Sequence, residues 1–230
     1  MIALRFLFVM LVGYLVGSIP NGVIVSRLAG KGDVRQWGSG KTGATNVLRA
    51  VGKKAAALVL LLDMSKGALS VFFAGFMMQS DYVIVGDNTI WPLLRSAEGG
   101  AAIAAIAGHN WPVFLGFRGG RGVSTFMGGL AALCPVAAVF SGEVFIIGAG
   151  LTRYASFASI AGIVGSSAIM VPMTIYSGFP VEYLLYTLIS GAVIIYMHRD
   201  NIHRLRTGTE RKLGEKTESI DSAAVRERTK

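Results

Sequence analysis

The sequence predicts an all-α integral membrane protein, built as a bundle of about seven transmembrane helices. Hydrophobic residues make up 53% of the 230 residues and charged residues only 15%, with a mean hydropathy of +0.57. A soluble domain of this length carries about 25% charged residues. So few charges cannot cover the surface of a soluble globule, and so apolar a chain does not stay disordered. The apolar stretches and the placement of basic residues complete the evidence.

Long apolar stretches indicate the membrane-spanning helices, since a helix needs about 20 apolar residues to cross a bilayer. Residues 122–152 carry one charge, Glu143, and at about 1.5 Å per residue they are too long for one ordinary span. We therefore expect two short helices there, with a turn near residues 141–143. The other five expected spans are residues 6–26, 55–80, 99–117, 154–181 and 183–197.

Basic residues concentrate in two segments, and this bias predicts the orientation. Residues 27–54 contain seven Lys or Arg and the segment after His198 contains nine, whereas residues 81–98 contain one and residues 177–182 none. Lys and Arg gather on the cytoplasmic side of membrane proteins. Seven spans place every basic segment on that side, with the N-terminus outside and the C-terminus inside.

The remaining composition limits what else the chain contains. Residues 1–214 are expected to form a single transmembrane catalytic domain, and the polar, aperiodic residues 215–230 a disordered cytoplasmic tail. The single cysteine, Cys134, excludes an internal disulfide, and three dispersed histidines argue against a metal site. The net charge of +9 suits an anionic substrate, anionic lipid or nucleic acid.

The loop after the first span has the composition of an anion site. Small residues between Gly38 and Asn46 let a ligand approach the backbone, and successive free amides form a concave nest for anions. Arg49 adds a guanidinium suited to phosphate. A flexible interhelical loop is the alternative. The candidate binding residues are Ser39, Gly40, Gly43, Thr45, Asn46 and Arg49.

Three further polar elements are expected at the same membrane surface. Two arginines stand among three glycines after the third span, two serines follow an arginine at the spacing of one helix face, and a histidine precedes an asparagine by three residues. An ordinary polar or basic helix end is the alternative for each. The candidate residues are Arg118, Arg121, Arg153, Ser156, Ser159, His198 and Asn201. Four such elements on one face predict an anionic substrate.

Ionisable side chains also occur within the expected spans. Asp63 and Lys66 are separated by about one helical turn, and ionisable groups in a span are costly unless they are paired or functional. We expect a mutual ion pair near the cytoplasmic boundary. His109 lies just inside its span, where a hydrogen bond to another helix is expected.

These motifs resemble the acyl-phosphate glycerol-3-phosphate acyltransferase family of bacterial inner membranes (the PlsY family). The similarity is carried by Gly17-Ser18-Ile19-Pro20, Gly38-Ser39-Gly40, Gly43-Ala44-Thr45-Asn46, Arg49, Gly108-His109, Gly119-Gly120-x-Gly122, Arg153 with its serines, His198-x-x-Asn201 and Gly208-x-Glu210. Two features depart from the family pattern. Lys41 replaces the usual Asn, and Arg118 and Arg121 replace Lys, which keeps the charge but not the compact ammonium.

The resemblance implies a multi-pass enzyme of the bacterial inner membrane, with its active site on the cytoplasmic face. It implies transfer of a fatty acyl group from acyl phosphate to position 1 of sn-glycerol-3-phosphate, the first acylation of phospholipid synthesis. The products are lysophosphatidate and inorganic phosphate. By this resemblance the acyl-phosphate head is held by Ser39, Gly40 and Thr45. Glycerol phosphate is held by Arg49, Arg118 or Arg121, Ser156 or Ser159, His198 and Asn201. Besides membrane lipid and the two substrates, no cofactor, metal ion or nucleic acid is expected.

The chemistry leaves two schemes for the proton of the acceptor hydroxyl. Acyl phosphate is already activated, so cations and amides that stabilise the leaving phosphate and the oxyanion serve the reaction. In one scheme His198 is the base; in the other, which we favour, a substrate phosphate oxygen takes the proton. The His-x4-Asp motif of acyl-CoA acyltransferases does not occur at His109 or His198.

The alternative function is a membrane transporter of a phosphorylated solute. Transporters place their binding sites near the bilayer midplane. Here the polar motifs gather at one surface, which favours an enzyme.

Overall fold

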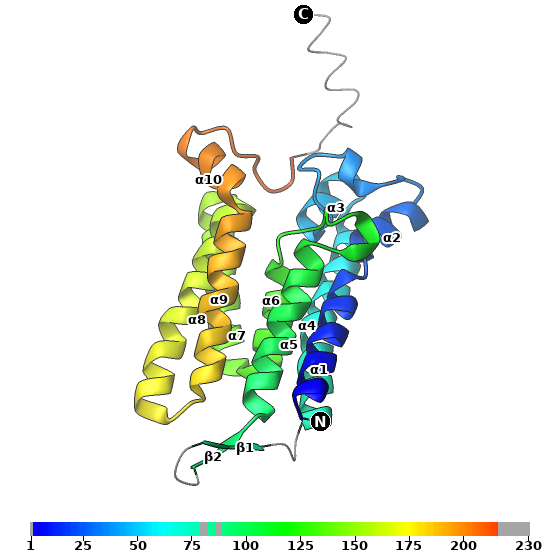
Figure 1. Cartoon of the computed structure of the whole chain (residues 1–230). Helices are drawn as coiled ribbons and strands as arrows, with labels where there is room; N and C mark the ends of the chain where they lie inside the picture. Colours follow the sequence, from blue (N-terminus) through cyan, green and yellow to red (C-terminus); the bar gives the residue numbers. More distant parts are fainter. Residues whose placement is uncertain (1, 79–81, 86–88, 216–230) are drawn as a thin grey trace, which may run out of the picture.

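The computed structural model describes residues 2–78, 82–85 and 89–215. Long helices run side by side, as predicted, with a two-stranded hairpin at one end of the bundle (Figure 1). The helices are α1 (Ile2–Ser18), α2 (Asn21–Leu28), α3 (Ala44–Ala50), α4 (Lys53–Met78), α5 (Leu94–Asn110), α6 (Val123–Leu133), α7 (Pro135–Thr152), α8 (Ala155–Ser177), α9 (Val181–Met197) and α10 (Arg199–Arg206). Two 3-10 helices, η1 (Val34–Gln36) and η2 (Val113–Leu115), and strands β1 (Tyr82–Val85) and β2 (Thr89–Pro92) complete the described elements.

The helices have the lengths and composition of an integral membrane protein. Among the described residues, four helical segments are long and apolar enough to cross a membrane: Ile2–Leu28, Lys53–Met78, Pro135–Thr152 and Ala155–Ser177. Helices α9 and α10 pass the same test together, although they meet at a bend of 60°. Helix α6 is apolar but shorter. The predicted membrane helix bundle is therefore confirmed in its class.

The polar loops gather at one end of the bundle. Figure 1 shows α2, α3 and α10 at the top, and the hairpin and the N-terminus at the bottom. The glycine-rich loop before α3, the loop between α5 and α6, the start of α8 and the end of α9 all lie at the upper end. The four polar elements predicted from the sequence therefore share one end of the molecule, which we call the polar end.

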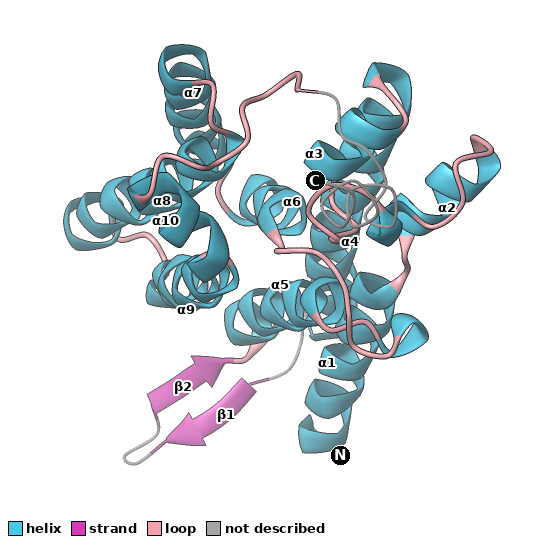
Figure 2. Cartoon of the chain, turned by 90° about the horizontal axis from the view of Figure 1, so that it is seen from above, coloured by secondary structure: helices cyan, strands magenta, loops and turns pink. Residues whose placement is uncertain are grey.

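Helix α6 lies in the middle of the bundle, where it packs against α4, α5, α7 and α9 (Figure 2). Its crossing with α4 is close: a Cβ atom on Gly67 would overlap the carbonyl of Thr125. On its other side, the rings of Phe126 and Tyr186 stack with centroids 5.4 Å apart, and the Tyr186 hydroxyl donates to the Phe126 carbonyl over 2.7 Å. These contacts fix the position of the N-terminus of α6, which begins at the polar end.

Two helices end at prolines, at positions that differ from the predicted boundaries. The span predicted over residues 6–26 is broken between α1 and α2 at Ile19-Pro20, because proline has no backbone N–H to continue the helix. The span predicted over residues 99–117 begins earlier, at Leu94, and ends at Asn110. It ends there because Pro112 disfavours helical geometry at the residue before it.

The turn predicted within residues 122–152 is in the wrong place. Two helices are present, but the break falls at Cys134, and Pro135 occupies the first position of α7, where proline is favoured. Ser141 and Glu143 lie inside α7. The Ser141 hydroxyl is buried and donates to the Gly162 carbonyl of α8 over 2.8 Å. Ser141 therefore serves a contact between helices rather than a turn.

The hairpin was not predicted, and most of the predicted tail lies outside the described residues. The prediction of an all-α chain missed the hairpin, in which β1 and β2 pair antiparallel with Tyr82 opposite Pro92. Of the predicted tail, residues 216–230 lie outside the described residues, so its predicted disorder stays a prediction.

Candidate active site

A cavity of about 490 Å³ lies at the polar end, between α3, α4, α6, α7, α8 and α10. Its polar wall is formed by Ser39, Lys41, Gly43, Thr45, Asn46, Arg49, His109, Arg121, Ser124, Ser156, Ser159, His198, Asn201 and Glu210. Its apolar wall is formed by Leu60, Met64, Val123, Met127, Phe145, Ile146 and Ile163. The cavity thus joins a charged compartment to an apolar one, as a ligand with a charged head and an alkyl chain requires.

The buried amide of Asn46 shapes the glycine-rich loop. Its Nδ2 atom donates to the carbonyls of Val34, Trp37 and Lys41, each over 2.9 Å. Its Oδ1 atom accepts from the backbone N–H of Ser39 over 3.1 Å. Both amide hydrogens are used inside the loop, so Asn46 positions the loop around the cavity.

Three cations face the cavity from separate segments: Lys41, Arg49 and Arg121. The Nε atoms of Arg49 and Arg121 are buried and have no hydrogen-bond partner among the described residues. Burial, followed by the nearby charge of Arg204, lowers the pKa of Arg121 to about 10. Burial and a neighbouring cation also lower the pKa of Arg49 and that of Lys41. A bound anion would offset both the burial and the mutual repulsion of these groups.

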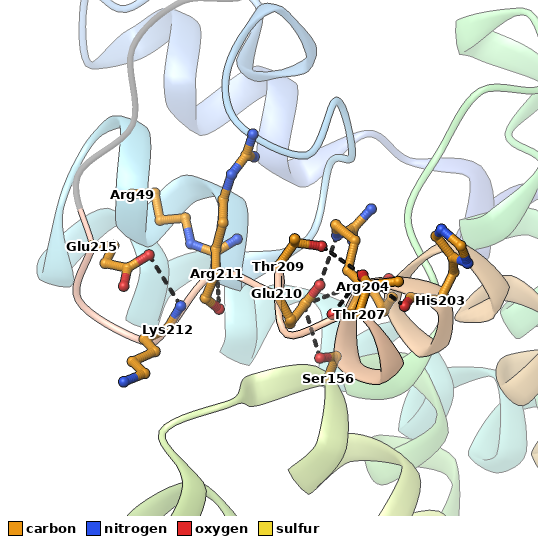
Figure 3. A network of polar contacts seen from close by, with 11 residues as sticks. Arg49, Ser156, His203, Arg204, Thr207, Thr209, Glu210, Arg211, Lys212 and Glu215 are labelled. Atoms are coloured by element: carbon orange, nitrogen blue, oxygen red, sulfur yellow. Dashed lines mark hydrogen bonds and ion pairs between the residues drawn. The ribbon is translucent and has the colours of Figure 1, made fainter.

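The carboxylate of Glu210 accepts hydrogen bonds from two helices, α8 and α10, at the rim of the cavity. Its Oε1 atom accepts from the Ser156 hydroxyl over 2.8 Å and from Asn201 Nδ2 over 2.7 Å. Its Oε2 atom accepts from Arg204 Nε over 2.7 Å (Figure 3). Burial opposes ionisation of Glu210, but the hydrogen bonds from Asn201, Ser156 and Arg204 outweigh it and lower its pKa. Ser156, Asn201 and the chain after α10 are thereby held together.

The segment of residues 207–215, here called the strap, crosses the polar end from α10 toward α3. Near its middle, the carbonyl of Arg211 accepts a hydrogen bond from Arg49 Nη2 over 3.2 Å (Figure 3). The backbone N–H of Leu213 donates to the carbonyl of Arg153 over 2.7 Å. The strap therefore links the α8–α10 side of the cavity to the α3 side.

His198 is 2% exposed, at the bend between α9 and α10. Its Nδ1 atom lies 2.8 Å from the carbonyl of Ile194. A carbonyl only accepts, so Nδ1 carries the proton and Nε2 has a free lone pair. Burial and the charge of Arg121 lower the pKa of His198 to about 4, which keeps the ring neutral at neutral pH. The side chain therefore presents a neutral acceptor and is a weak base.

The structure brings most of the predicted site residues together. Ten line the cavity: Ser39, Gly43, Thr45, Asn46, Arg49, Arg121, Ser156, Ser159, His198 and Asn201. Gly40 belongs to the same loop but does not line the cavity. Arg118 is exposed and also stands outside its lining. The sequence pattern predicts the same role for both arginines, but of the two only Arg121 lines the cavity.

The spacing predicts that Arg153 shares a helix face with Ser156 and Ser159, but the structure does not show this arrangement. Arg153 caps the end of α7 with φ of 62° and an exposed side chain, whereas the two serines lie in α8. Four residues of the polar wall were missed as site residues: Lys41, His109, Ser124 and Glu210. Glu210 had one available signal, because it is an acidic residue in a segment otherwise rich in Lys and Arg.

The described residues contain no group of three or more His, Cys, Asp or Glu side chains placed to hold a metal ion.

Comparison with known proteins agrees with this architecture. A family profile described as glycerol-3-phosphate acyltransferase matches residues 7–208. The chain is 55% identical to glycerol-3-phosphate acyltransferase 3 of Dehalococcoides mccartyi strain CBDB1, over 94% of this chain and 99% of the relative. It is 40% identical to the glycerol-3-phosphate acyltransferase of Halalkalibacterium halodurans, over 90% and 94% of the two chains.

Solved structures give the same result. The fold is similar to a crystal structure of PlsY, an integral membrane glycerol 3-phosphate acyltransferase, in its glycerol 3-phosphate form. The TM-score is 0.77 and the identity 37%, over 91% of this chain and 96% of that chain. A lysophosphatidic acid form of PlsY gives a TM-score of 0.75 at the same identity, over 91% and 95% of the two chains.

Proposed function

Because this chain belongs to the glycerol-3-phosphate acyltransferase family, we propose that it transfers a fatty acyl group from acyl phosphate to position 1 of sn-glycerol-3-phosphate. The products are lysophosphatidate and inorganic phosphate, as in the first acylation of phospholipid synthesis. One observation carries the proposal: the cavity has, beside an apolar wall, the buried Nε atoms of Arg49 and Arg121, which have no hydrogen-bond partner among the described residues. Two phosphate-bearing substrates, one with an alkyl chain, need both compartments.

The proposed reaction is a direct acyl transfer. The position-1 hydroxyl oxygen of glycerol phosphate attacks the acyl carbonyl carbon, and the bond from that carbon to the phosphate oxygen breaks. The electron pair of the broken bond leaves on phosphate, which ends as hydrogen phosphate once it takes the hydroxyl proton. Lys41, Arg49 and Arg121 stabilise the negative charge that develops on the oxyanion and the leaving group.

His198 fits a positioning role in this reaction. A base with a pKa of about 4 removes a hydroxyl proton poorly at neutral pH. The free lone pair on Nε2 instead accepts a hydrogen bond from the glycerol hydroxyl and orients its oxygen. A phosphate oxygen of the substrate takes the proton. The hydroxyls of Ser156 and Ser159 complete the glycerol phosphate subsite, together with the Oδ1 atom of Asn201, which has no partner among the described residues.

The proposal includes a topology and a location. Seven helices (α1, α4, α5, α6, α7, α8 and α9) cross or enter the bacterial inner membrane, with the N-terminus outside and the polar end in the cytoplasm. The basic loop before α4 and the basic segment after α9 both lie at the polar end, which supports this orientation. Residues 1–214 act as a single catalytic unit without cofactor or nucleic acid.

The decisive experiment uses the purified chain in proteoliposomes with radiolabelled glycerol phosphate. We expect labelled lysophosphatidate when the donor is acyl phosphate, and little or none when it is acyl-CoA. Comparable turnover with acyl-CoA would contradict the proposed donor. Accumulation of label inside the vesicles without acylated product would instead support a transporter of phosphorylated solutes.

A further inference from the structure

A second polar cluster is buried beside the cavity, and the proposed reaction does not use it. Asp63 and Lys66 of α4 form the ion pair that their spacing predicts, with Oδ1 and Nζ 2.7 Å apart. Their exposed fractions are 1% and 4%. The same Oδ1 atom accepts from Asn21 Nδ2 of α2 over 3.1 Å and lies 3.7 Å from His109 Nδ1 of α5.

The cluster lies where both anion-binding loops begin or end. Helix α2 leads into the glycine-rich loop, and α4 follows α3, which that loop precedes. Helix α5 leads into the loop of Gly119 to Arg121. A void of about 10 Å³ is lined by Asp63, Lys66, His109 and Thr42, so a residue of the glycine-rich loop borders the same void as the cluster. One carboxylate is thus shared by helices that carry the two loops.

His109 transmits this contact to Arg121. Its ring lines both the small void and the large cavity. A Cβ atom on Gly120 would overlap the His109 ring, and the Gly120 N–H donates to the His109 carbonyl over 3.0 Å. The residue before Arg121 is therefore packed onto the histidine, and any shift of the ring displaces the loop.

An ion pair is not needed here for stability alone. Removing two charges from water is expensive, and replacing a buried ion pair by apolar side chains of similar volume is often neutral or stabilising. Asp63 also has a second oxygen, Oδ2, that is buried without a partner among the described residues. A cluster that is costly to bury and that touches both loops has a positional use.

We propose that Asp63 is a positioning residue for phosphate binding: paired with Lys66, it holds Asn21 and His109 so that both anion-binding loops face the same substrate. This inference rests on the proposed function, because it concerns the geometry of that cavity. It assigns no substrate contact to Asp63, which does not line the large cavity.

The test separates positioning from folding. The double variant Asp63→Leu with Lys66→Met removes both charges at once, so no unpaired charge stays buried. We expect its melting temperature to stay within roughly 5 °C of wild type. We expect its KM for glycerol phosphate and its inhibition constant for inorganic phosphate to rise together, by roughly 10- to 100-fold.

A milder variant and a matched control complete the experiment. Asn21→Leu removes one neutral contact to Asp63 outside the large cavity, and it should raise both constants by a smaller factor. Glu98→Gln is the matched control. It changes a carboxylate near the start of α5, far along the helix from His109, that accepts a hydrogen bond from the Tyr183 hydroxyl. It should change neither constant.

The outcomes distinguish this inference from the proposed function. If wild type acylates glycerol phosphate while the Asn21 variant and the folded double variant keep wild-type constants, the positioning role is wrong. If the double variant does not fold, the test rests on Asn21→Leu. The positioning role is then wrong if this variant keeps the wild-type KM for glycerol phosphate and the wild-type inhibition constant for phosphate. A wild-type protein with no acyl transfer at all refutes the proposed function instead.

Discussion

The side chains of Asn201 and Glu210 meet 2.7 Å apart, although one lies in α10 and the other in the strap beyond it. The amide of Asn201 is held by this bond so that its Oδ1 atom, buried and unpartnered among the described residues, is free for a ligand. A single carboxylate in the polar wall of the cavity therefore orients a predicted substrate contact and fixes the strap.

Glu210→Ala should destabilise the protein and remove most activity. The change leaves Asn201, Ser156 and Arg204 without their shared acceptor, which should cost roughly 2–4 kcal/mol. Thermal unfolding in detergent and steady-state kinetics measure the two effects. Glu215→Gln, at the exposed end of the strap, is the control and should behave like wild type.

The same carboxylate predicts a pH dependence of stability. The hydrogen bonds of Glu210 lower its pKa below the ordinary value of 4.5, so their contribution is fully present above that pH. It is lost as the pH falls through the lowered pKa. The melting temperature of wild type should therefore drop more between pH 5 and pH 3 than that of Glu210→Gln. Parallel melting curves for the two proteins would contradict this assignment.

Arg121→Ala should lower kcat/KM far more than Arg118→Ala. Arg121 lines the cavity, and its Nε atom has no partner within the described part of the chain, whereas Arg118 is exposed outside the cavity. Losing a strong electrostatic donor costs on the order of 2–4 kcal/mol, or roughly 30- to 1,000-fold in rate. Arg118→Ala should stay within about threefold, the range of a surface substitution. If both variants fold and lose kcat/KM equally, Arg118 also contributes to the active site.

His198→Gln should raise KM for glycerol phosphate and leave a measurable kcat. Glutamine supplies a neutral hydrogen-bonding group where the imidazole presents its acceptor. Because burial lowers the pKa of His198 to about 4, wild-type activity should show no loss from its protonation near pH 6.5. A kcat collapse of about 10⁴-fold with unchanged KM would make His198 the base.

Cysteine labelling tests the orientation of the bundle. In a background without Cys134, cysteines at Lys31 and Lys212, both exposed at the polar end, should react only with reagent on the cytoplasmic side. A cysteine at Ser177, where α8 ends at the far side, should react only from outside. Reaction of Lys31 and Lys212 variants from opposite faces would exclude the proposed topology.

Sequence patterns predicted which polar segments meet at the cavity, because these segments are marked by their local composition. Gly43, Thr45 and Arg49 in one loop, and His198 and Asn201 at one helical turn, all reach the same cavity. The choice between Arg118 and Arg121 required the packing of the loop on His109, which is a long-range contact. Spacing along the chain carries no information about such a contact.

Helix boundaries were harder to predict than the existence of helices. The turn expected near residues 141–143 rested on one serine and one glutamate, but Ser141 is satisfied by the neighbouring helix. Pro135 was the better signal, since proline favours the first position of a helix. Glu210 was noticed without a role, because the three donors that it gathers come from two helices, one of them 54 residues earlier in the chain.

Leu60 of α4 and Ile146 of α7 line the cavity and are 43% and 69% exposed. In the proposed membrane orientation, an alkyl chain between them has the bilayer as its neighbour. Passing a chain of about 16 carbons through water would cost roughly 13 kcal/mol, at about 0.8 kcal/mol per methylene. A sideways route avoids this barrier, which by itself would slow release about 10⁹-fold. Under the proposed function and orientation, a newly made single-chain lipid is delivered into one leaflet only, so that growth of the opposite leaflet depends on a separate step of lipid translocation.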